Sequence, residues 1–171
     1  MVVHIVVDPS KCSGCRYCEL WCSYAHEKVF STSLSRIRVV KDDLLGMDFP
    51  IVCQRCEEVA CVLACHAGAL HLDSEGIVRL EKEKCLKCGA CSDACPYDAV
   101  FQSPVDGSPL ICDLCGGDVT CVAKCPTNAL SLYPAAEVVV AGAEGLGRRY
   151  KLAISEYKKL LERWGIRVRI E

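Results

Sequence analysis

The chain has 171 residues, a formal net charge of −2 and 16 cysteines. This length suits one compact unit or two very small ones. We expect no nucleic-acid partner, and we expect no membrane span because no uninterrupted apolar stretch reaches the necessary length. Aromatic residues make up only 6% of the chain, so a core this poor in large side chains is expected to depend on bound metal.

The opening of the chain shows no signal-peptide pattern. Residues 1–7 form too short an apolar stretch, lack a charged segment before them and lead straight into the first cysteines. We therefore expect a cytoplasmic protein, in which cysteines stay reduced and serve as metal ligands rather than forming disulfides.

The first group of cysteines follows a short β-strand that we predict over residues 2–7. The spacing of the group is x2, x2, x3, and its members are Cys12, Cys15, Cys18 and Cys22. Tyr17 and Trp21 lie inside the group; we expect both to serve in packing, with shielding of a bound cluster as the alternative. Residues 36–40 alternate like an edge strand, and residues 41–48 predict a polar connection.

Three further groups of four cysteines follow. The second has the spacing x2, x4, x3 and consists of Cys53, Cys56, Cys61 and Cys65. The third has the spacing x2, x2, x3 and consists of Cys85, Cys88, Cys91 and Cys95, followed by Pro96. The fourth has the spacing x2, x5, x3 and consists of Cys112, Cys115, Cys121 and Cys125, followed by Pro126. Gly116 and Gly117 would let the longest of these gaps turn back sharply.

The third group has the spacing of bacterial ferredoxins, whose thiolates hold 4Fe-4S clusters. In that arrangement the first three cysteines and the more distant fourth bind different clusters, so each group needs another to complete it. Zinc sites pair one C-x2-C with a distant second one, and crowded C-x2-C-x2-C runs disfavour disulfides. We therefore predict four 4Fe-4S clusters, with four zinc sites as the alternative.

An internal repeat follows the last cysteine of groups two to four. Each time we predict a helical turn leaving the cysteine and then an apolar pair that enters a strand. Residues 69–80 alternate on both sides of Asp-Ser-Glu-Gly, which predicts a β-hairpin. The sequence thus indicates an α+β fold of two nested bacterial-type dicluster ferredoxin modules, with short hairpins and short helices around the clusters.

This interpretation divides the chain into two parts. Residues 1–135 would form the four-cluster domain, with an outer module from runs 12–22 and 112–125 and an inner module from runs 53–65 and 85–95. Residues 136–171 would form a C-terminal extension with a basic helix and a short strand.

The C-terminal extension contains no cysteine. Its glycines at 142, 145 and 147 follow the order GxxGxG, which differs from a dinucleotide-binding loop, and too little chain remains for a βαβ unit. Residues 147–164 carry one apolar stripe and predict a helix that ends at Gly165, followed by a short strand over 166–170. Residues 146–171 hold eight Lys or Arg against three Glu; this indicates either a solvated helix face or a docking extension.

The four-group pattern resembles the four-cluster, ferredoxin-like iron–sulfur subunits of multi-subunit redox enzymes over about residues 1–135. Such subunits occur in dimethyl sulfoxide reductase, formate dehydrogenase and carbon monoxide dehydrogenase–hydrogenase systems. The segments CSGCRYCELWCSYAHEKVF, SRIRVV and PIVCQRCEEVAC look most like the small subunits associated with tungsten-pterin aldehyde oxidoreductases and class II benzoyl-CoA reductase complexes.

The resemblance implies which cysteines share a cluster, with group one pairing with four and two with three. One outer cluster would take Cys12, Cys15, Cys18 and Cys125, and the other Cys22, Cys112, Cys115 and Cys121. The inner clusters would take Cys53, Cys56, Cys61 and Cys95, and Cys65, Cys85, Cys88 and Cys91. The sequence departs from the family's Cys-Pro pattern at Ser23 and at His66. We expect His66 to be an ordinary loop residue, with a role as ligand or proton relay as the alternative.

The expected function is electron transfer without catalysis. The sequence shows no nucleophile with its base and no phosphate loop, so we predict a non-catalytic subunit that relays single electrons. It would connect a large catalytic subunit, which we expect to be a tungsten-pterin aldehyde oxidoreductase, to an external carrier such as ferredoxin or a flavin subunit. The alternatives are a stand-alone polyferredoxin, a structural zinc module, or a subunit of a molybdopterin enzyme, a hydrogenase or a carbon monoxide dehydrogenase.

Overall fold

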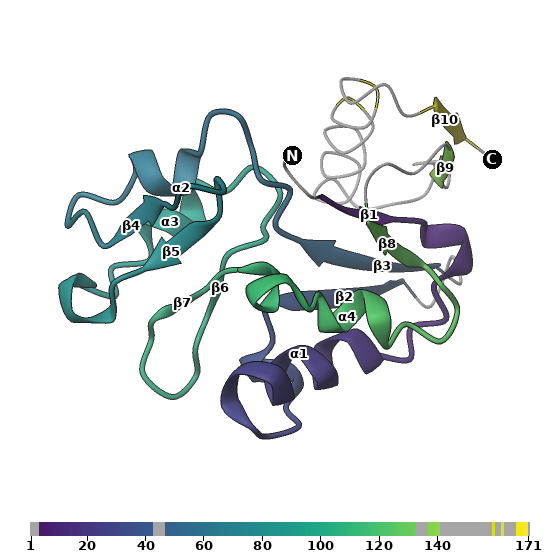
Figure 1. The fold of residues 1–171 in the computed structure, drawn as a ribbon, viewed down its shortest axis with the longest axis horizontal. Helices are drawn as coiled ribbons and strands as arrows, with labels where there is room; N and C mark the ends of the chain where they lie inside the picture. Colours follow the sequence, from purple (N-terminus) through teal and green to yellow (C-terminus); the bar gives the residue numbers. More distant parts are fainter. Residues whose placement is uncertain are drawn as a thin grey trace.

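The computed structural model describes residues 4–42, 47–132, 137–140, 159, 162 and 167–170. Within these ranges the strands form five two-stranded sheets, joined by short helices and turns (Figure 1). This arrangement confirms the predicted α+β class. Figure 1 shows α2, α3, β4 and β5 gathered on the left, and α1, α4, β1, β2, β3 and β8 on the right.

The first described strand pairs with the strand that follows the fourth cysteine group. Strand β1 (Ile5–Val7) runs antiparallel to β8 (Leu130–Leu132), with Val6 opposite Ser131. The three residues of β1 are at most 2% exposed. The strand predicted over 2–7 is therefore confirmed for Ile5–Val7, and it brings the first cysteine group beside the end of the fourth.

The first cysteine group runs into the longest described helix, α1 (Tyr17–Glu27). Group one has Ser23 where groups three and four have proline, so the backbone N–H is kept and the helix continues beyond Cys22. Ser23 is fully buried; its Oγ donates to the carbonyl of Leu20 at 2.9 Å and accepts the N–H of Ser31 at 2.9 Å. The residue that departs from the family pattern thus fixes the chain after α1.

After α1 the chain forms an antiparallel hairpin of β2 (Ile37–Asp42) and β3 (Met47–Val52). The strand predicted over 36–40 is confirmed, but the polar connection predicted over 41–48 was wrong at both ends. Lys41 pairs with Asp48 in register, and their side chains form an ion pair at 3.3 Å. Polar residues can extend a hairpin in this way when they face each other across the strands.

Each of the other cysteine groups contains a one-turn helix. These are α2 (Ala60–Leu63), α3 (Ala90–Asp93) and α4 (Thr120–Ala123). The prediction of a helical turn after the last cysteine was wrong in place, because each helix precedes that cysteine. Gly68, Asp98 and Asn128 lie three residues beyond it with positive φ, and the left-handed backbone there prevents a helix from continuing.

The apolar pairs of the repeat enter the structure as predicted. Strand β4 (Leu70–Leu72) pairs with β5 (Val78–Leu80) in the predicted hairpin, and β6 (Phe101–Gln102) pairs with β7 (Pro109–Leu110). Short 3-10 turns lie at Pro9–Lys11, Thr32–Leu34, Lys82–Lys84 and Leu114–Gly117. Gly116 and Gly117 have φ of 67° and 110°, which confirms the sharp turn predicted for them.

Two clusters of buried side chains form the core. The larger contains Ile5, Val7, Ile37, Val52 and Leu130 among others, together with Cys18, Cys22 and Cys121. The smaller consists of Cys61, Leu70, Val78, Val100 and Ile111. Cysteines are part of both, in keeping with a chain that has few large apolar residues.

The C-terminal part is described only at its ends. Strand β9 (Glu137–Val140) runs parallel to β10 (Arg167–Ile170), which confirms the strand predicted over 166–170. The helix predicted over 147–164 lies outside the described residues except for Lys159 and Glu162, both helical and exposed. The glycines at 142, 145 and 147 also lie outside them. Within the described ranges, none of the helices has the length and apolar character needed to cross a membrane.

Candidate metal centres

Cysteine thiols from distant parts of the chain lie close enough to act on one another electrostatically. All sixteen are described, and none is part of a disulfide. We name the four predicted sets of four cysteines sites A to D. Site A comprises Cys12, Cys15, Cys18 and Cys125; site B comprises Cys22, Cys112, Cys115 and Cys121. Site C comprises Cys53, Cys56, Cys61 and Cys95; site D comprises Cys65, Cys85, Cys88 and Cys91.

Site A joins the loop before α1 to the turn after α4. Burial raises the pKa of Cys12, and the nearby charges of Asp48, Cys15 and Cys125 add to this rise. Burial likewise raises the pKa of Cys18 to about 12, with Glu19, Cys12 and Cys15 contributing. Thiols this close together repel one another as thiolates, so a cation between them is what would stabilise the charged form.

Cys125 in site A behaves differently. Burial alone would raise its pKa, but hydrogen bonds from the backbone of Leu130, Thr127 and Ala129 and from the Thr127 side chain lower it. A ring of donors around one sulfur stabilises a thiolate and would stabilise a metal-bound sulfur in the same way.

Site B joins α1 to the loop of the fourth group. Burial raises the pKa of Cys112 well above its usual value, and the charges of Cys121, Cys53 and Cys22 contribute. Cys121 is raised in the same direction by burial and by Cys22 and Cys115. The backbone N–H of Arg36 donates to Cys22 Sγ at 3.3 Å, and such bonds to sulfur are among the factors that set cluster potentials.

Sites C and D lie in the half of the protein that contains β4 and β5. In site C, burial raises the pKa of Cys53 to about 12, with the charges of Cys56, Cys61 and Cys95 contributing. Cys95 Sγ accepts the N–H of Ala99 at 3.3 Å. In site D all four thiols line one cavity of about 170 Å³, whose wall also includes His66, Leu86 and Lys87.

The sites are also neighbours of one another. Cys18 of site A contributes to the raised pKa of Cys121 in site B, although burial is the larger cause. In the same way Cys53 of site C acts on Cys112 of site B. Cys91 of site D acts on Cys61 of site C, whose pKa burial raises to about 11. Thiols of sites A and B, of B and C, and of C and D therefore act on one another.

An ion pair that the sequence did not reveal borders site B. His26 Nε2 lies 2.7 Å from Asp113 Oδ1, and His26 Nδ1 lies 2.8 Å from the carbonyl oxygen of Cys22. Burial opposes the charge on both residues, but their hydrogen bonds outweigh it, so the pKa of His26 rises to about 10 and that of Asp113 falls to about 2. Asp113 Oδ1 also accepts the N–H of Cys115 at 3.1 Å. The pair thus joins the two segments that supply site B.

Only part of this pair could have been found from the sequence. His26 follows Cys22 by four residues, and the i, i+4 spacing places both on the same face of a helix. Asp113 is 87 residues away from His26, and nothing in the local pattern connects them.

Glu19 is a second residue that the pattern did not single out. It is 2% exposed, and its Oε1 accepts the N–H of Val39 at 2.6 Å. Its Oε2 is buried with no hydrogen-bond partner among the described residues. Burial raises the pKa of this carboxyl.

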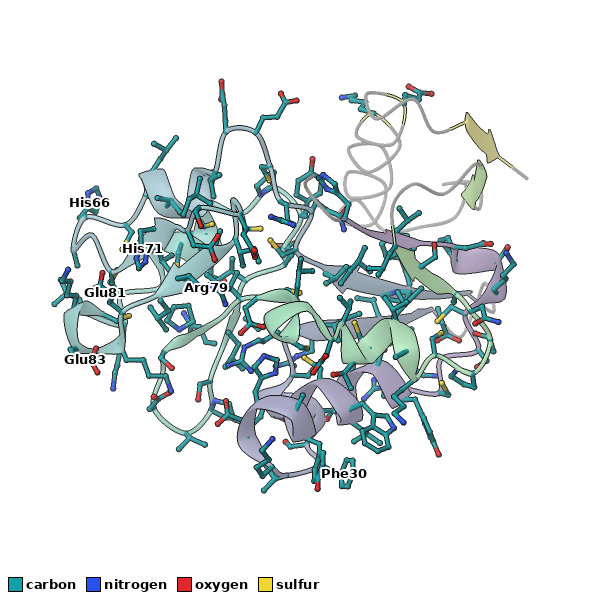
Figure 2. All side chains as sticks on the ribbon, viewed as in Figure 1. Phe30, His66, His71, Arg79, Glu81 and Glu83 are labelled. Carbon is teal, nitrogen blue, oxygen red and sulfur yellow. The ribbon has the colours of Figure 1, made fainter. Side chains whose placement is uncertain are left out.

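Three further residues near the cysteines were expected to have a structural role rather than to bind a cluster: His66, Trp21 and Tyr17. His66 is exposed on the turn after Cys65, at the outer edge of the half that holds β4 and β5 (Figure 2). Trp21 packs edge-on against Tyr24 and Phe30, whereas Tyr17 is 50% exposed. The packing role expected for Trp21 is confirmed, but Tyr17 leaves half its surface to solvent.

Residues 46–135 match the family described as the 4Fe-4S dicluster domain. The chain belongs to this family. The match confirms the predicted resemblance to ferredoxin-like iron–sulfur proteins, and together with the sixteen cysteines it supports iron–sulfur clusters as the cofactor.

Relatives extend over most of the chain. The chain is 44% identical over 124 residues to the aliphatic sulfonate oxidoreductase, polyferredoxin-like subunit, of Pyrococcus furiosus, covering 72% of this chain and 71% of that protein. It is 36% identical to the electron transport protein HydN of Escherichia coli K12, covering 74% and 85%. It is 32% identical to a chain in the solved active site complex BamBC of benzoyl coenzyme A reductase with benzoyl-CoA, covering 77% and 78%, with a TM-score of 0.48.

Proposed function

We propose that this chain is a non-catalytic electron-transfer subunit of an oxidoreductase complex and that it carries four 4Fe-4S clusters. The observation that carries the proposal is that thiols from distant cysteine groups lie close to one another in a chain of the dicluster family. The names of two relatives, a polyferredoxin-like oxidoreductase subunit and an electron transport protein, support the role.

Sites A, B, C and D would each hold one cluster through their four cysteines. The donors are sulfur only and four in number, which suits a cubane. Backbone N–H groups directed at Cys22, Cys95 and Cys125 would stabilise the sulfurs of a bound cluster. When bound, a 4Fe-4S cluster accepts and releases one electron at a time.

The pairing supports two nested modules. Sites A and B combine runs 12–22 and 112–125 and would form the outer module; sites C and D combine runs 53–65 and 85–95 and would form the inner one. Apart from Ile77, the larger cluster of buried side chains comes from residues 5–52 and 114–130. The smaller cluster comes from residues 61–111, which agrees with this division. Residues 1–135 would be the four-cluster domain, and residues 136–171 a docking extension.

A series of sites in the order A, B, C, D would support electron transfer through the subunit rather than electron storage in it. Each site has a thiol near a thiol of the next, so the series continues without a break from the loop before α1 to the cavity of site D. A subunit with its sites in series can connect a partner at one end to a carrier at the other.

The partner that we propose is a large tungsten-pterin aldehyde oxidoreductase-type subunit, with ferredoxin or a flavin subunit as the external carrier, in the cytoplasm. The support is the resemblance of the first group and the residues around it to small subunits of that class. A molybdopterin enzyme, hydrogenase or carbon monoxide dehydrogenase as the partner, or a stand-alone polyferredoxin, is the second candidate; the name of the HydN relative keeps the carrier role open.

The experiment is an anaerobic purification of the native complex through an affinity tag on this chain. Tungsten, molybdenum, nickel, iron and zinc are then measured in the purified material. Tungsten with a large subunit in a fixed ratio is the expected result. Molybdenum or nickel would contradict the tungsten partner and leave the relay role standing, whereas a chain that purifies alone would contradict the subunit role.

A further inference from the structure

The outer face of α1 and the turn after it carry a compact group of exposed aromatic side chains. Tyr24 and Phe30 stack with their ring centroids 4.7 Å apart. Trp21 meets Tyr24 and Phe30 edge-on, at 5.8 Å and 5.6 Å. We call these residues, together with Tyr17 and Val29, the aromatic patch.

The aromatic patch faces solvent. Phe30 is 57% exposed, Tyr17 50%, Val29 47% and Tyr24 40%. Figure 2 shows Phe30 at the lower edge of the molecule, below α1. The opposite face of α1 already supplies the core through Cys18, Glu19, Cys22 and Ser23. Tyr17, Tyr24 and Phe30 therefore belong to a second, largely exposed face of the helix and the turn after it, with Trp21 partly buried beside them, and contiguous exposed apolar patches of this kind mark interaction sites.

The aromatic patch is held in a fixed shape. The N–H of Lys28 donates to the Tyr24 carbonyl at 3.0 Å and ends the helix, and the N–H of Ser31 donates to the buried Ser23 Oγ at 2.9 Å. Phe30 lies between these two anchors. A surface that is ordered before binding loses little conformational entropy when a partner docks.

Positive charge borders the aromatic patch. Lys124 Nζ lies 4.7 Å from the centre of the Trp21 ring, and Lys28 Nζ lies 5.9 Å from that of Tyr24. The nearby Glu27 faces Arg36 at 3.5 Å. Complementarity therefore favours a partner surface with an apolar depression edged by Asp and Glu side chains.

The same charges oppose the pairing of two copies of this chain. In a two-fold dimer the same surface meets itself, so the lysines of one copy would face those of the other. Like charges brought together in this way disfavour such a contact.

The position of the aromatic patch suits electron transfer. Cys18 and Cys22 lie on the buried face of the helix whose outer face carries the patch, and they belong to sites A and B. A helix with its side chains is about 10–12 Å across, so a partner on the patch would lie about one helix diameter from two proposed cluster sites. Site D lies at the other end of the series and would remain accessible.

We propose that the aromatic patch is the docking surface for the catalytic subunit of the complex, through an apolar depression bordered by carboxylates. This inference rests on the proposed function and adds the end of the series at which the catalytic partner binds. The external carrier would then meet the site D end.

The test compares two single variants of the tagged full-length chain. Phe30→Asp places a charge at the centre of the aromatic patch, and Leu63→Asp is the matched control, because Leu63 is 77% exposed on α2. The dissociation constant between the chain and the redox subunit that co-purifies with the wild type is measured anaerobically, together with iron per chain. Phe30→Asp is expected to weaken binding about 30-fold or more, the effect of losing a hot-spot residue, while Leu63→Asp stays within about twofold.

A second variant of the aromatic patch keeps the test valid if Phe30→Asp fails to fold. Lys124→Glu reverses an exposed charge at the border of the aromatic patch and is expected to weaken binding and to reduce the salt dependence of association. Wild-type binding by both Phe30→Asp and Lys124→Glu, with the complex intact, would overturn the docking site and leave the proposed function standing. If the variants instead abolished a dimer of this chain and left the complex with the catalytic subunit intact, the aromatic patch would bind a second copy of the chain. That result would also overturn the proposal. The absence of any redox subunit with the wild type would instead contradict the proposed function itself.

Discussion

The ion pair between His26 and Asp113 gives the most specific prediction for stability. The substitution His26→Gln removes the charge that faces Asp113 at 2.7 Å, in a place where the two side chains are only 12% and 27% exposed. Hydrogen bonds that involve charged groups contribute about 2 kcal/mol. With a urea dependence of about 2 kcal/mol per molar, the unfolding midpoint should fall by about 1 M.

The assay is anaerobic urea unfolding of the cluster-loaded protein, followed by the loss of visible absorption. The matched control is His71→Gln, because His71 faces Glu81 at 3.4 Å with side chains 46% and 42% exposed. Exposed pairs of this kind contribute at most about 1 kcal/mol, so this midpoint should move by less than about 0.5 M.

The pH dependence of the same variant provides the refuting result. The raised pKa of His26, about 10 against 6.5, means that its contribution is complete below 6.5 and is lost as the pH rises through about 10. The lowered pKa of Asp113, about 2 against 3.8, means that its contribution is complete above 3.8 and is lost as the pH falls through about 2. The difference in unfolding midpoint between wild type and His26→Gln should therefore be largest between pH 3.8 and pH 6.5. Equal shifts for His26→Gln and His71→Gln, or a difference that persists above about pH 10, would refute the reasoning.

Three further predictions concern the framework around the sites. Ser23→Ala removes the buried acceptor of the Ser31 N–H and should cost about 2 kcal/mol, or about 6 °C in Tm, whereas Ser33→Ala, at an exposed position, should change Tm by less than about 2 °C. Gly68→Ala should cost about 1 kcal/mol because φ there is +61°, but Gly68→Asn should cost less, since Asp98 and Asn128 adopt this backbone at the equivalent places; equal losses of Tm would contradict that equivalence. Removal of iron by oxidation and chelation should abolish hydrogen-exchange protection first in β4 and β5, because the smaller buried cluster has only a few apolar side chains besides its cysteines; protection that survives would show that this half folds without metal.

The local patterns were sufficient for part of the fold. The hairpin of β4 and β5 was predictable because Asp73, Glu75 and Gly76 form a turn by themselves: Asp73 Oδ1 accepts the N–H of Glu75, and Gly76 has φ of +70°. The spacing of the cysteines indicated the family because a cubane requires thiolates at fixed steps along the chain.

Other elements depend on contacts that no local pattern reveals. The length of α1 depends on contacts of its C-terminal half. Ser23 accepts the N–H of Ser31, and His26 pairs with Asp113, which lies 87 residues later in the chain. The extension of β2 and β3 depends on Lys41 facing Asp48 across the strands. The helical turns were predicted after the last cysteine of each group, whereas they lie before it. The sequence does not reveal the left-handed backbone at Asp98 and Asn128, because many residue types can adopt this conformation and few require it. Tertiary contacts decide such cases over local propensity.

The most direct test of the account is the iron and acid-labile sulfide content of this chain, purified anaerobically and freed of any partner. Four filled sites predict about sixteen irons and about sixteen sulfides per chain. A value of about eight irons would contradict the four-cluster assignment and leave one dicluster module. Zinc in place of iron would contradict the electron-transfer role altogether.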